Sequence, residues 1–350
     1  MESISLARGV PAPECLPVAE LADCAREAIE NDGTTVLSYG PAGGYAPLRE
    51  WIADRHGIEP GQVVVTNGSL QGFQFLAELL APTGPVLVEA PTYDRPLKIL
   101  AAVEAEVIPI PLDDDGTVGS PAFFYTIPTF QNPTGRTLPL SRREALAGLA
   151  KAGMLVLEDD PYGLVRFEGE ALPTVFELAG GENVVYSSSF SKTIAPGLRV
   201  GYLVLPDALA VEVEAIAAAA YITPALLSQA TVYEFLRRGN LEPNLERVSG
   251  LLQARRDAMV AALERHLPEA SWAVPEGGYF LWLELPPGIM TADLLAEGVT
   301  FVPGVDFFAG AGGENALRLA FSYVSPAEIE EGTRRLASAV RAAMLLRSAA

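Results

Sequence analysis

The sequence predicts an α/β fold: a large domain with a mostly parallel, buried sheet, followed by a smaller α+β domain. Two observations lead to this prediction. Between Gln62 and Val204, short strands rich in β-branched residues alternate with helices, which is typical of a parallel sheet covered on both faces. From about Ala210 onward, long helices come first and several strands follow, so the alternation of the first part ends there.

The elements of the first part follow from apolar spacing and turn residues. Residues 1–14 are expected to be irregular, and helical spacing with a stop at Asp32-Gly33 predicts a helix over 17–31. A Gly-rich loop over 39–44 follows it. The remaining elements predicted here are helix 46–56, strand 63–65, a helix ending at 80, strand 86–88, helix 96–102, strands 107–110 and 123–126, helix 141–152, and strands 154–157, 184–187 and 199–204.

The second part is predicted to contain helices at 211–220, 228–237 and 245–266, alternating strands within 271–285, strands at 301–303 and 317–322, and a closing helix at 326–346. We therefore divide the chain into an N-terminal segment that packs with the small domain (1–35), a large domain (36–245) and a small C-terminal domain (246–350).

Composition excludes several classes of protein. The chain has 350 residues, 49% of them hydrophobic, and a net charge of −20, so it offers no basic cluster for nucleic acid. Its two cysteines, Cys15 and Cys24, form no disulfide framework, and the two histidines, His56 and His266, are far apart. Neither a signal peptide nor a membrane span is expected, so we expect a cytoplasmic protein.

Polar motifs directly follow several of the predicted strands. In parallel sheets, the loops that leave the carboxyl ends of the strands bind ligands. Gly68 and Ser69 open a helix whose free N–H groups suit an anion, although an ordinary capped turn is the alternative. Tyr93, after the next strand, suits stacking on a flat heteroaromatic ring or simple packing. Asn132 is held extended before Pro133, so its amide can face a phenolate or carboxylate oxygen, or belong to a tight turn.

Three adjacent acids, Glu158, Asp159 and Asp160, end a buried strand. Adjacent carboxylates raise one another's pKa, so a cationic partner is expected. A protonated pyridine nitrogen would serve, and Tyr162, three residues past Asp159, would then reach the phenolic oxygen of the same ring. A helix-capping cluster and a divalent-metal site are the alternatives.

Lys192 lies in a Ser-rich run that ends at Arg199. Hydroxyls, a flexible backbone and Arg199 suit a phosphate, and an amine that can lose its proton suits a Schiff base with a carbonyl. Pyridoxal 5'-phosphate carries an aldehyde and a phosphate on one ring. A solvated loop is the alternative for the run alone, but the motifs before it supply the other parts of a pyridoxal site in a fixed order along the chain.

With these motifs the chain resembles the fold-type I, class I/II pyridoxal-phosphate-dependent aminotransferases. The nearest subgroup holds the 2-aminoadipate aminotransferases and the effector domains of pyridoxal-dependent transcription regulators. The resemblance covers nearly the whole chain. Its motifs are residues 39–49, 91–93, 131–135, 158–162, 189–192 with 196–199, 275–278 and 317–319.

The resemblance implies a role for each site residue. Lys192 would form the Schiff base and shuttle the proton, Asp159 would pair with the pyridine nitrogen, and Tyr93 would stack on the ring. Tyr162 and Asn132 would bind the phenolic oxygen, and Arg318 with Asn132 would bind the substrate α-carboxylate. The phosphate would be held by Gly68, Ser69, Leu70, Ser189 and Arg199, and by Tyr39 of a second subunit in a homodimer with shared active sites.

The resemblance also implies the function: transfer of an amino group between an L-amino acid and a 2-oxo acid. Two departures stand out. Leu70 replaces the Gln usual in the subgroup. The N-terminal helix that contributes to side-chain recognition in aminoadipate enzymes is absent before Leu6, so the resemblance does not extend to the aminoadipate preference. Another pyridoxal-dependent reaction (elimination, replacement, cyclisation or oxidation) is the alternative. A regulator's effector domain is disfavoured, because no helix-turn-helix or basic linker precedes the matching region.

Overall fold

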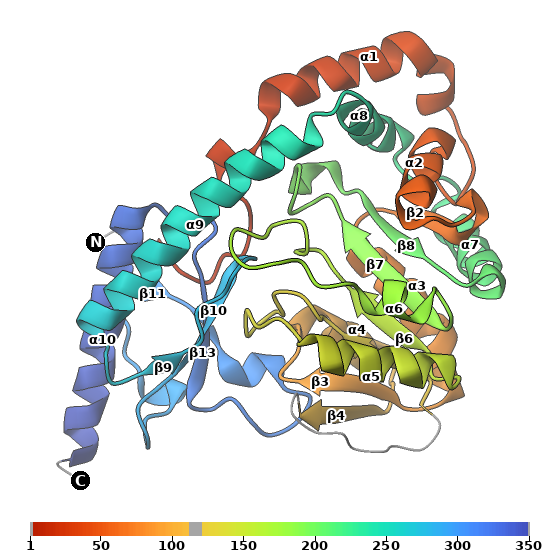
Figure 1. Ribbon diagram of the computed structural model, residues 1–350. Coiled ribbons are helices and arrows are strands. Elements are labelled where there is room, and N and C mark those ends of the chain that lie inside the picture. Colours follow the sequence, from red (N-terminus) through yellow and green to blue (C-terminus); the bar gives the residue numbers. More distant parts are fainter. Residues whose placement is uncertain (1–2, 112–120, 349–350) are drawn as a thin grey trace.

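The computed structural model describes residues 3–111 and 121–348. Its large domain is built on a seven-stranded sheet with the order β2-β8-β7-β6-β5-β3-β4 (Figure 1). The strands are β2 (Val63–Thr66), β3 (Val86–Ala90), β4 (Val107–Pro111), β5 (Phe123–Thr126), β6 (Val156–Asp159), β7 (Val184–Ser189) and β8 (Gly201–Val204).

One strand runs against the others. β8 pairs antiparallel with both β2 and β7, whereas the pairs from β7 through β6, β5 and β3 to β4 are parallel. Gly201, the first residue of β8, pairs with Thr66 and with Ser189, which lie at the carboxyl ends of β2 and β7. A residue just before β8 therefore reaches the same edge of the sheet as residues that follow the other strands.

Both faces of this sheet are buried, as the alternation of side chains along a strand requires. Val63 and Val65 belong to one hydrophobic core, and Val64 between them belongs to the other. The first core is closed by α2 (Ala46–His56), α5 (Leu140–Lys151), α6 (Val175–Ala179) and α8 (Leu226–Arg237), and the second by α3 (Ser69–Leu80), α4 (Asp94–Ala102) and α7 (Asp207–Tyr221). The prediction of an α/β domain with a mostly parallel sheet is confirmed.

The small domain has its own sheet and core. Its antiparallel sheet has the order β12-β13-β10-β9, and α9 (Leu241–His266) and α10 (Pro326–Ser348) cover it (Figure 1). The strands are β9 (Ser271–Trp272), β10 (Phe280–Glu284), β12 (Val302–Pro303) and β13 (Ala316–Ala320), and a separate strand, β11 (Val299–Thr300), precedes β12. The helix α9 joins both domains, because Leu241 belongs to a core of the large domain and Val248 to the core of the small one.

The N-terminal segment divides between the two domains. Strand β1 (Ile4–Ser5) pairs with β11, and the 3-10 helix η1 (Pro13–Cys15) packs against α9. The helix α1 (Val18–Val36) packs on α8 instead, and Cys24 and Ala28 join the large-domain core. We propose that only residues up to about 16 belong with the small domain, and that the remaining boundary falls inside α9 near residue 245.

Most predicted elements lie within a few residues of the observed ones, and the differences have physical reasons. The helix α1 continues past the predicted stop through a kink at Asp32, because Val36 is buried in the core. The strands predicted across 271–285 are interrupted at 273–279, where Gly278, at φ 71°, brings the backbone against the Phe130 side chain. The short elements β1 and α6 were not predicted. Within the part of the chain that the structure describes, no helix carries an apolar stretch long enough to span a membrane.

Candidate active site

The carboxyl edge of the large sheet gathers most of the predicted site residues. Gly68 and Ser69 follow β2, Tyr93 follows β3, and Asn132 lies in the loop after β5. Asp159 ends β6 and Ser189 ends β7, with Lys192 three residues later. Arg199 reaches the same edge because it precedes the antiparallel strand β8. Arg318 comes from β13 of the small domain, so the site lies between the two domains.

The side-chain amine of Lys192 lies in a largely aromatic pocket. Its Nζ is 5.2 Å from the ring centroid of Tyr279 and 5.8 Å from that of Tyr162, and it donates a hydrogen bond of 2.9 Å to the backbone carbonyl of Gly9. Burial, helped by the positive charges of Arg318 and Arg199, lowers the pKa of the Lys192 amine to about 8, although Asp159 opposes the shift. A minor fraction of this amine is therefore uncharged at neutral pH, and a large fraction is uncharged at mildly alkaline pH.

The backbone of the lysine loop is fixed from the other side of the site. The Tyr279 hydroxyl donates to the Lys192 carbonyl at 2.8 Å, and the Asn244 amide of α9 donates to the Thr193 carbonyl at 2.6 Å. Both donors are held by the small domain or by the helix that leads into it. The position of Lys192 therefore depends on the contact between the domains.

The three adjacent acids have separate partners. Glu158 accepts hydrogen bonds from the backbone N–H groups of Val175 and Phe176, at 3.0 and 2.8 Å, and so holds the start of α6. Asp160 accepts from the Tyr186 hydroxyl at 3.0 Å and from the Gly163 N–H at 2.8 Å. Among residues 3–111 and 121–348, no group of three His, Cys, Asp or Glu side chains is arranged to hold a metal ion.

Asp159 is the acid that belongs to the site. Its carboxylate accepts from the Tyr125 hydroxyl at 2.9 Å and from the Ser187 hydroxyl at 3.3 Å, and Lys192 is close enough to lower its pKa. Burial nevertheless dominates and raises the pKa of Asp159 to about 6. A buried carboxylate with this penalty is stabilised by a cation placed beside it.

A second group of residues forms an anion cradle. Gly68 has φ 92°, and a side chain there would collide with the Arg199 guanidinium, which donates to the Asn67 carbonyl at 3.2 Å. Ser69 starts α3, so the unpaired N–H groups of that helix face the same place. The buried Ser189 hydroxyl is bonded to Ser191 at 2.8 Å. A helix N-terminus, an arginine and serine hydroxyls suit a phosphate.

Arg318 is a buried guanidinium, only 8% exposed, at the opposite end of the site. It donates to the Asn132 side-chain oxygen at 2.9 Å and to the Ala7 carbonyl at 3.1 Å, and it lies over the rings of Phe280 and Phe307. Its Nε has no hydrogen-bond partner among the described residues. A carboxylate is the natural ligand of such a fork.

Comparison with known proteins identifies the family of this arrangement. The family profile for aminotransferase class I and II matches residues 4–336. The chain belongs to the class I and II aminotransferases. It is 39% identical to the 2-aminoadipate transaminase of Thermus thermophilus, over 98% of this chain and 91% of that protein. It is 35% identical to an aromatic-amino-acid aminotransferase of Thermococcus litoralis, over 97% and 88% of the two chains.

Solved structures of aminotransferases match this chain as well. The crystal structure of the α-aminoadipate aminotransferase LysN from Thermus thermophilus, bound to N-(5'-phosphopyridoxyl)-L-leucine, matches with a TM-score of 0.91 and 36% identity, covering 98% of this chain and 93% of that one. The prediction of a fold-type I, pyridoxal-phosphate-dependent aminotransferase is confirmed, including its likeness to the aminoadipate subgroup.

The residues of this aminotransferase fit pyridoxal phosphate. The cradle at Gly68 and Arg199 suits the phosphate, Asp159 suits a protonated ring nitrogen, and the Lys192 amine suits the aldehyde. Tyr93 is half-buried, and burial raises the pKa of its hydroxyl to about 12, with Asp159 and Arg318 both nearby. Burial also raises the pKa of Tyr162, whose neighbours include Tyr93, Arg318 and Asp159.

Two residues predicted to hold the phosphate, Tyr39 and Leu70, contribute less to the anion cradle within one protomer. The Tyr39 side chain is 82% exposed on the loop before α2. Leu70 follows Ser69 in the first turn of α3 and can offer only its backbone to an anion.

Sequence reasoning missed several residues that shape the site. Gly9 and Ala7 touch Lys192 and Arg318 through backbone carbonyls, which leave no signal in the residue type. Tyr125 and Ser187 support Asp159 from β5 and β7. Tyr279 follows the Gly277-Gly278 pair, and that motif is the signal that pointed to this region.

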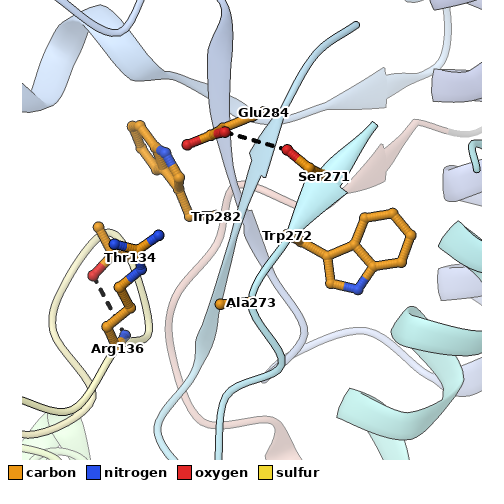
Figure 2. Close-up of a pocket in the computed structure, with 7 residues that line it drawn as sticks. All are labelled: Thr134, Arg136, Ser271, Trp272, Ala273, Trp282 and Glu284. Atoms are coloured by element: carbon orange, nitrogen blue, oxygen red, sulfur yellow. Dashed lines mark hydrogen bonds between the residues drawn. The ribbon is translucent and has the colours of Figure 1, made fainter. Parts of the chain in front are cut away.

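A shallow pocket of about 180 Å³ lies beside the site, between the loop after β5 and the edge of the small sheet (Figure 2). It is lined by Thr134, Arg136 and the β9 and β10 residues Ser271, Trp272, Ala273, Trp282 and Glu284, and Ser271 donates to Glu284 at 3.2 Å. Trp282 is the cross-strand neighbour of Arg318. The pocket therefore lies next to the strand that carries Arg318, and its lining residues are not those that surround Lys192.

Proposed function

We propose that this aminotransferase exchanges an amino group between an L-amino acid and a 2-oxo acid with Lys192 as its catalytic amine. The observation that supports this most is the setting of Lys192. Burial, helped by the positive charges of Arg318 and Arg199, lowers the pKa of its amine to about 8, against the opposing charge of Asp159. An amine that is partly uncharged at working pH can attack a carbonyl and accept a proton.

Bound pyridoxal phosphate supplies an aldehyde that condenses with amines and a ring that delocalises negative charge. Asp159 would keep the ring nitrogen protonated, and Tyr93 would stack on the ring. Tyr162 and Asn132 would bind the phenolic oxygen. The phosphate would be held by Gly68, Ser69, Leu70, Ser189 and Arg199.

Arg318 and Asn132 would orient the substrate through its α-carboxylate. The 2.9 Å hydrogen bond between them holds the guanidinium in one plane. Lys192 would then move the proton between the substrate Cα and C4', the aldehyde carbon of the cofactor, because it is the base at the centre of the site. Tyr162 and Tyr279 would exclude water around the amine, since their rings flank it.

The relatives suggest which substrates to try. Their names specify 2-aminoadipate, aromatic amino acids and kynurenine, so the substrate class varies at similar identity. We propose a panel of these amino acids and leucine, each with 2-oxoglutarate as acceptor, and measurement of the glutamate formed. Glutamate from at least one donor supports the proposal. A product other than the 2-oxo acid, formed from the donor without an acceptor, would instead indicate elimination, replacement, cyclisation or oxidation.

We propose further that the enzyme is a cytoplasmic homodimer with shared active sites, in which Tyr39 contacts the phosphate bound by the other subunit. The exposure of Tyr39 supports this arrangement, and the free, buried Cys15 and Cys24 suit a reducing compartment. Mixing Lys192→Ala and Tyr39→Ala subunits tests the shared site. Each mixed dimer would carry one intact site, so activity should return, whereas mixed dimers without activity would contradict sharing.

A further inference from the structure

A buried carboxylate outside the proposed catalytic set lies just behind the site. Glu89, on β3, is 5% exposed. It accepts hydrogen bonds from the Thr126 hydroxyl at 2.6 Å, the Ile127 N–H at 3.3 Å and the Gln131 side-chain amide at 3.1 Å. All three donors come from β5 and the loop that follows it. Glu89 therefore ties the end of β3 to the loop that carries Asn132.

Gln131 extends this link in both directions. Its amide nitrogen also donates to the Pro91 carbonyl at 2.7 Å, in the loop that carries Tyr93. Its oxygen accepts from the Thr134 N–H at 2.9 Å and from the Thr134 hydroxyl at 2.7 Å, which closes the turn around Asn132. Both ends of the Gln131 amide are thus occupied, so its orientation is fixed by Glu89, Pro91 and Thr134.

Asn132 is the next residue, and its oxygen accepts the 2.9 Å hydrogen bond from Arg318. An unbroken path of hydrogen bonds and one peptide unit therefore joins Glu89 to the two loops that bear Tyr93 and Asn132. A carboxylate can serve all three donors because it only accepts, whereas an amide in its place would turn an N–H₂ group toward one of them.

We propose that Glu89 is a positioning residue: acting through Gln131, it sets Asn132, and with it Arg318, in place for the cofactor ring and the substrate carboxylate. The inference rests on the proposed function, since it assigns Asn132 to those ligands. Glu89 itself touches neither ligand. Its substitution should therefore have a much larger effect while Asn132 is present than after Asn132 is removed.

The chain offers a matched control. Glu158, on β6, is separated from β3 by β5 and is also buried, at 1% exposed. It too accepts backbone hydrogen bonds, but these hold the start of α6. Replacing Glu158 by Gln should lower the melting temperature in the same way as Glu89→Gln. It should show no energetic coupling to Asn132.

The test is a double-mutant cycle on the dissociation constant of pyridoxal phosphate, measured by fluorescence on full-length apoprotein. Glu89→Gln should weaken binding about tenfold in the otherwise unchanged protein, and less than about twofold in the Asn132→Ala background. Glu158→Gln should have equal effects in both backgrounds. Equal effects of Glu89→Gln in both backgrounds would overturn the proposal. Gln131→Met removes the hydrogen bonds of the Gln131 amide, through which Glu89 is proposed to act. It should reproduce the coupling if Glu89→Gln does not fold.

A crystal structure of Glu89→Gln gives a readout that depends on no ligand. The hydrogen bond between Asn132 and Arg318 should be lost or lengthened in Glu89→Gln and kept in Glu158→Gln, and an unchanged bond would overturn the proposal. This result is separate from the proposed function. A protein that binds pyridoxal phosphate without transaminating contradicts the proposed function alone, while the cycle and the crystal structure still decide the role of Glu89.

Discussion

The side-chain amine of Lys192 donates a 2.9 Å hydrogen bond to the backbone carbonyl of Gly9. Two residues earlier, the Ala7 carbonyl accepts a hydrogen bond of 3.1 Å from Arg318. One short segment therefore contacts both ends of the site. The N-terminal segment, the large domain and the small domain therefore join at Lys192.

Gly9→Ala tests this segment. A methyl group at position 9 would collide with the Phe280 ring, so the segment must move away from Lys192 and Arg318. We expect the KM for the amino acid to rise about tenfold, in steady-state kinetics. Gly61→Ala is the control, because a methyl group there meets nothing within 4 Å. Equal kinetic constants for the two variants would show that the segment does not shape the substrate site.

The lowered pKa of Lys192 predicts how the capture of cofactor depends on pH. Only the uncharged amine attacks an aldehyde, and the pKa of this amine is about 8. The rate at which apoprotein takes up pyridoxal phosphate should therefore rise with pH, with a midpoint near 8, and level off above it. Stopped-flow absorbance measures the rate. A rate that still rises tenfold per pH unit above pH 9 would mean that the amine keeps its ordinary pKa.

Asp159→Asn tests the assignment within the acidic triplet. An amide cannot keep a pyridine nitrogen protonated, so kcat should fall by at least about 100-fold, the scale of losing one preorganised electrostatic partner. Asp160→Asn is the control, because Asp160 bonds to Tyr186 and Gly163 instead. It should lower the melting temperature and change kcat much less. The reverse ranking of the two kcat values would show that the roles are exchanged.

Tyr279→Phe removes the hydroxyl that holds the Lys192 carbonyl at 2.8 Å and keeps the ring beside the amine. We expect a loss of about 1 kcal/mol in the free energy of unfolding, as for one buried hydrogen bond. A looser lysine loop should also slow proton transfer, so the isotope effect with an amino acid deuterated at Cα should rise. An unchanged isotope effect with reduced stability would limit Tyr279 to a structural role.

Much of the fold and site could be predicted because strand ends carry the site residues. Asp159, Asn132 and Lys192 each follow or end a strand of the parallel sheet, and the loops after such strands meet at one edge. The helix at Ala46–His56 was predicted at its observed bounds, because Pro47 at its start and Gly57 after its end mark both termini.

Other features could not be predicted from local patterns. The three adjacent acids have different roles: Glu158 holds the start of α6 and Asp160 bonds to Tyr186, which leaves Asp159 for the site. The sequence does not show that α6 and Tyr186 lie near these acids. Strand β8 runs antiparallel to its neighbours, and this direction brings Arg199 to the site. It depends on the position of β8 in the sheet, which local sequence patterns do not reveal. The contacts of Gly9 and Ala7 use backbone carbonyls, which are the same in every residue.

Covalent trapping shows whether Lys192 carries the cofactor. Sodium borohydride should reduce the Schiff base of the purified holoenzyme and attach pyridoxal phosphate permanently to one peptide, identified by mass spectrometry. We expect the modified residue to be Lys192. We also expect Lys192→Ala to show no attachment and no glutamate formation while it keeps its fold by circular dichroism. Attachment at another lysine, or retained turnover in Lys192→Ala, would show that Lys192 is not the catalytic amine.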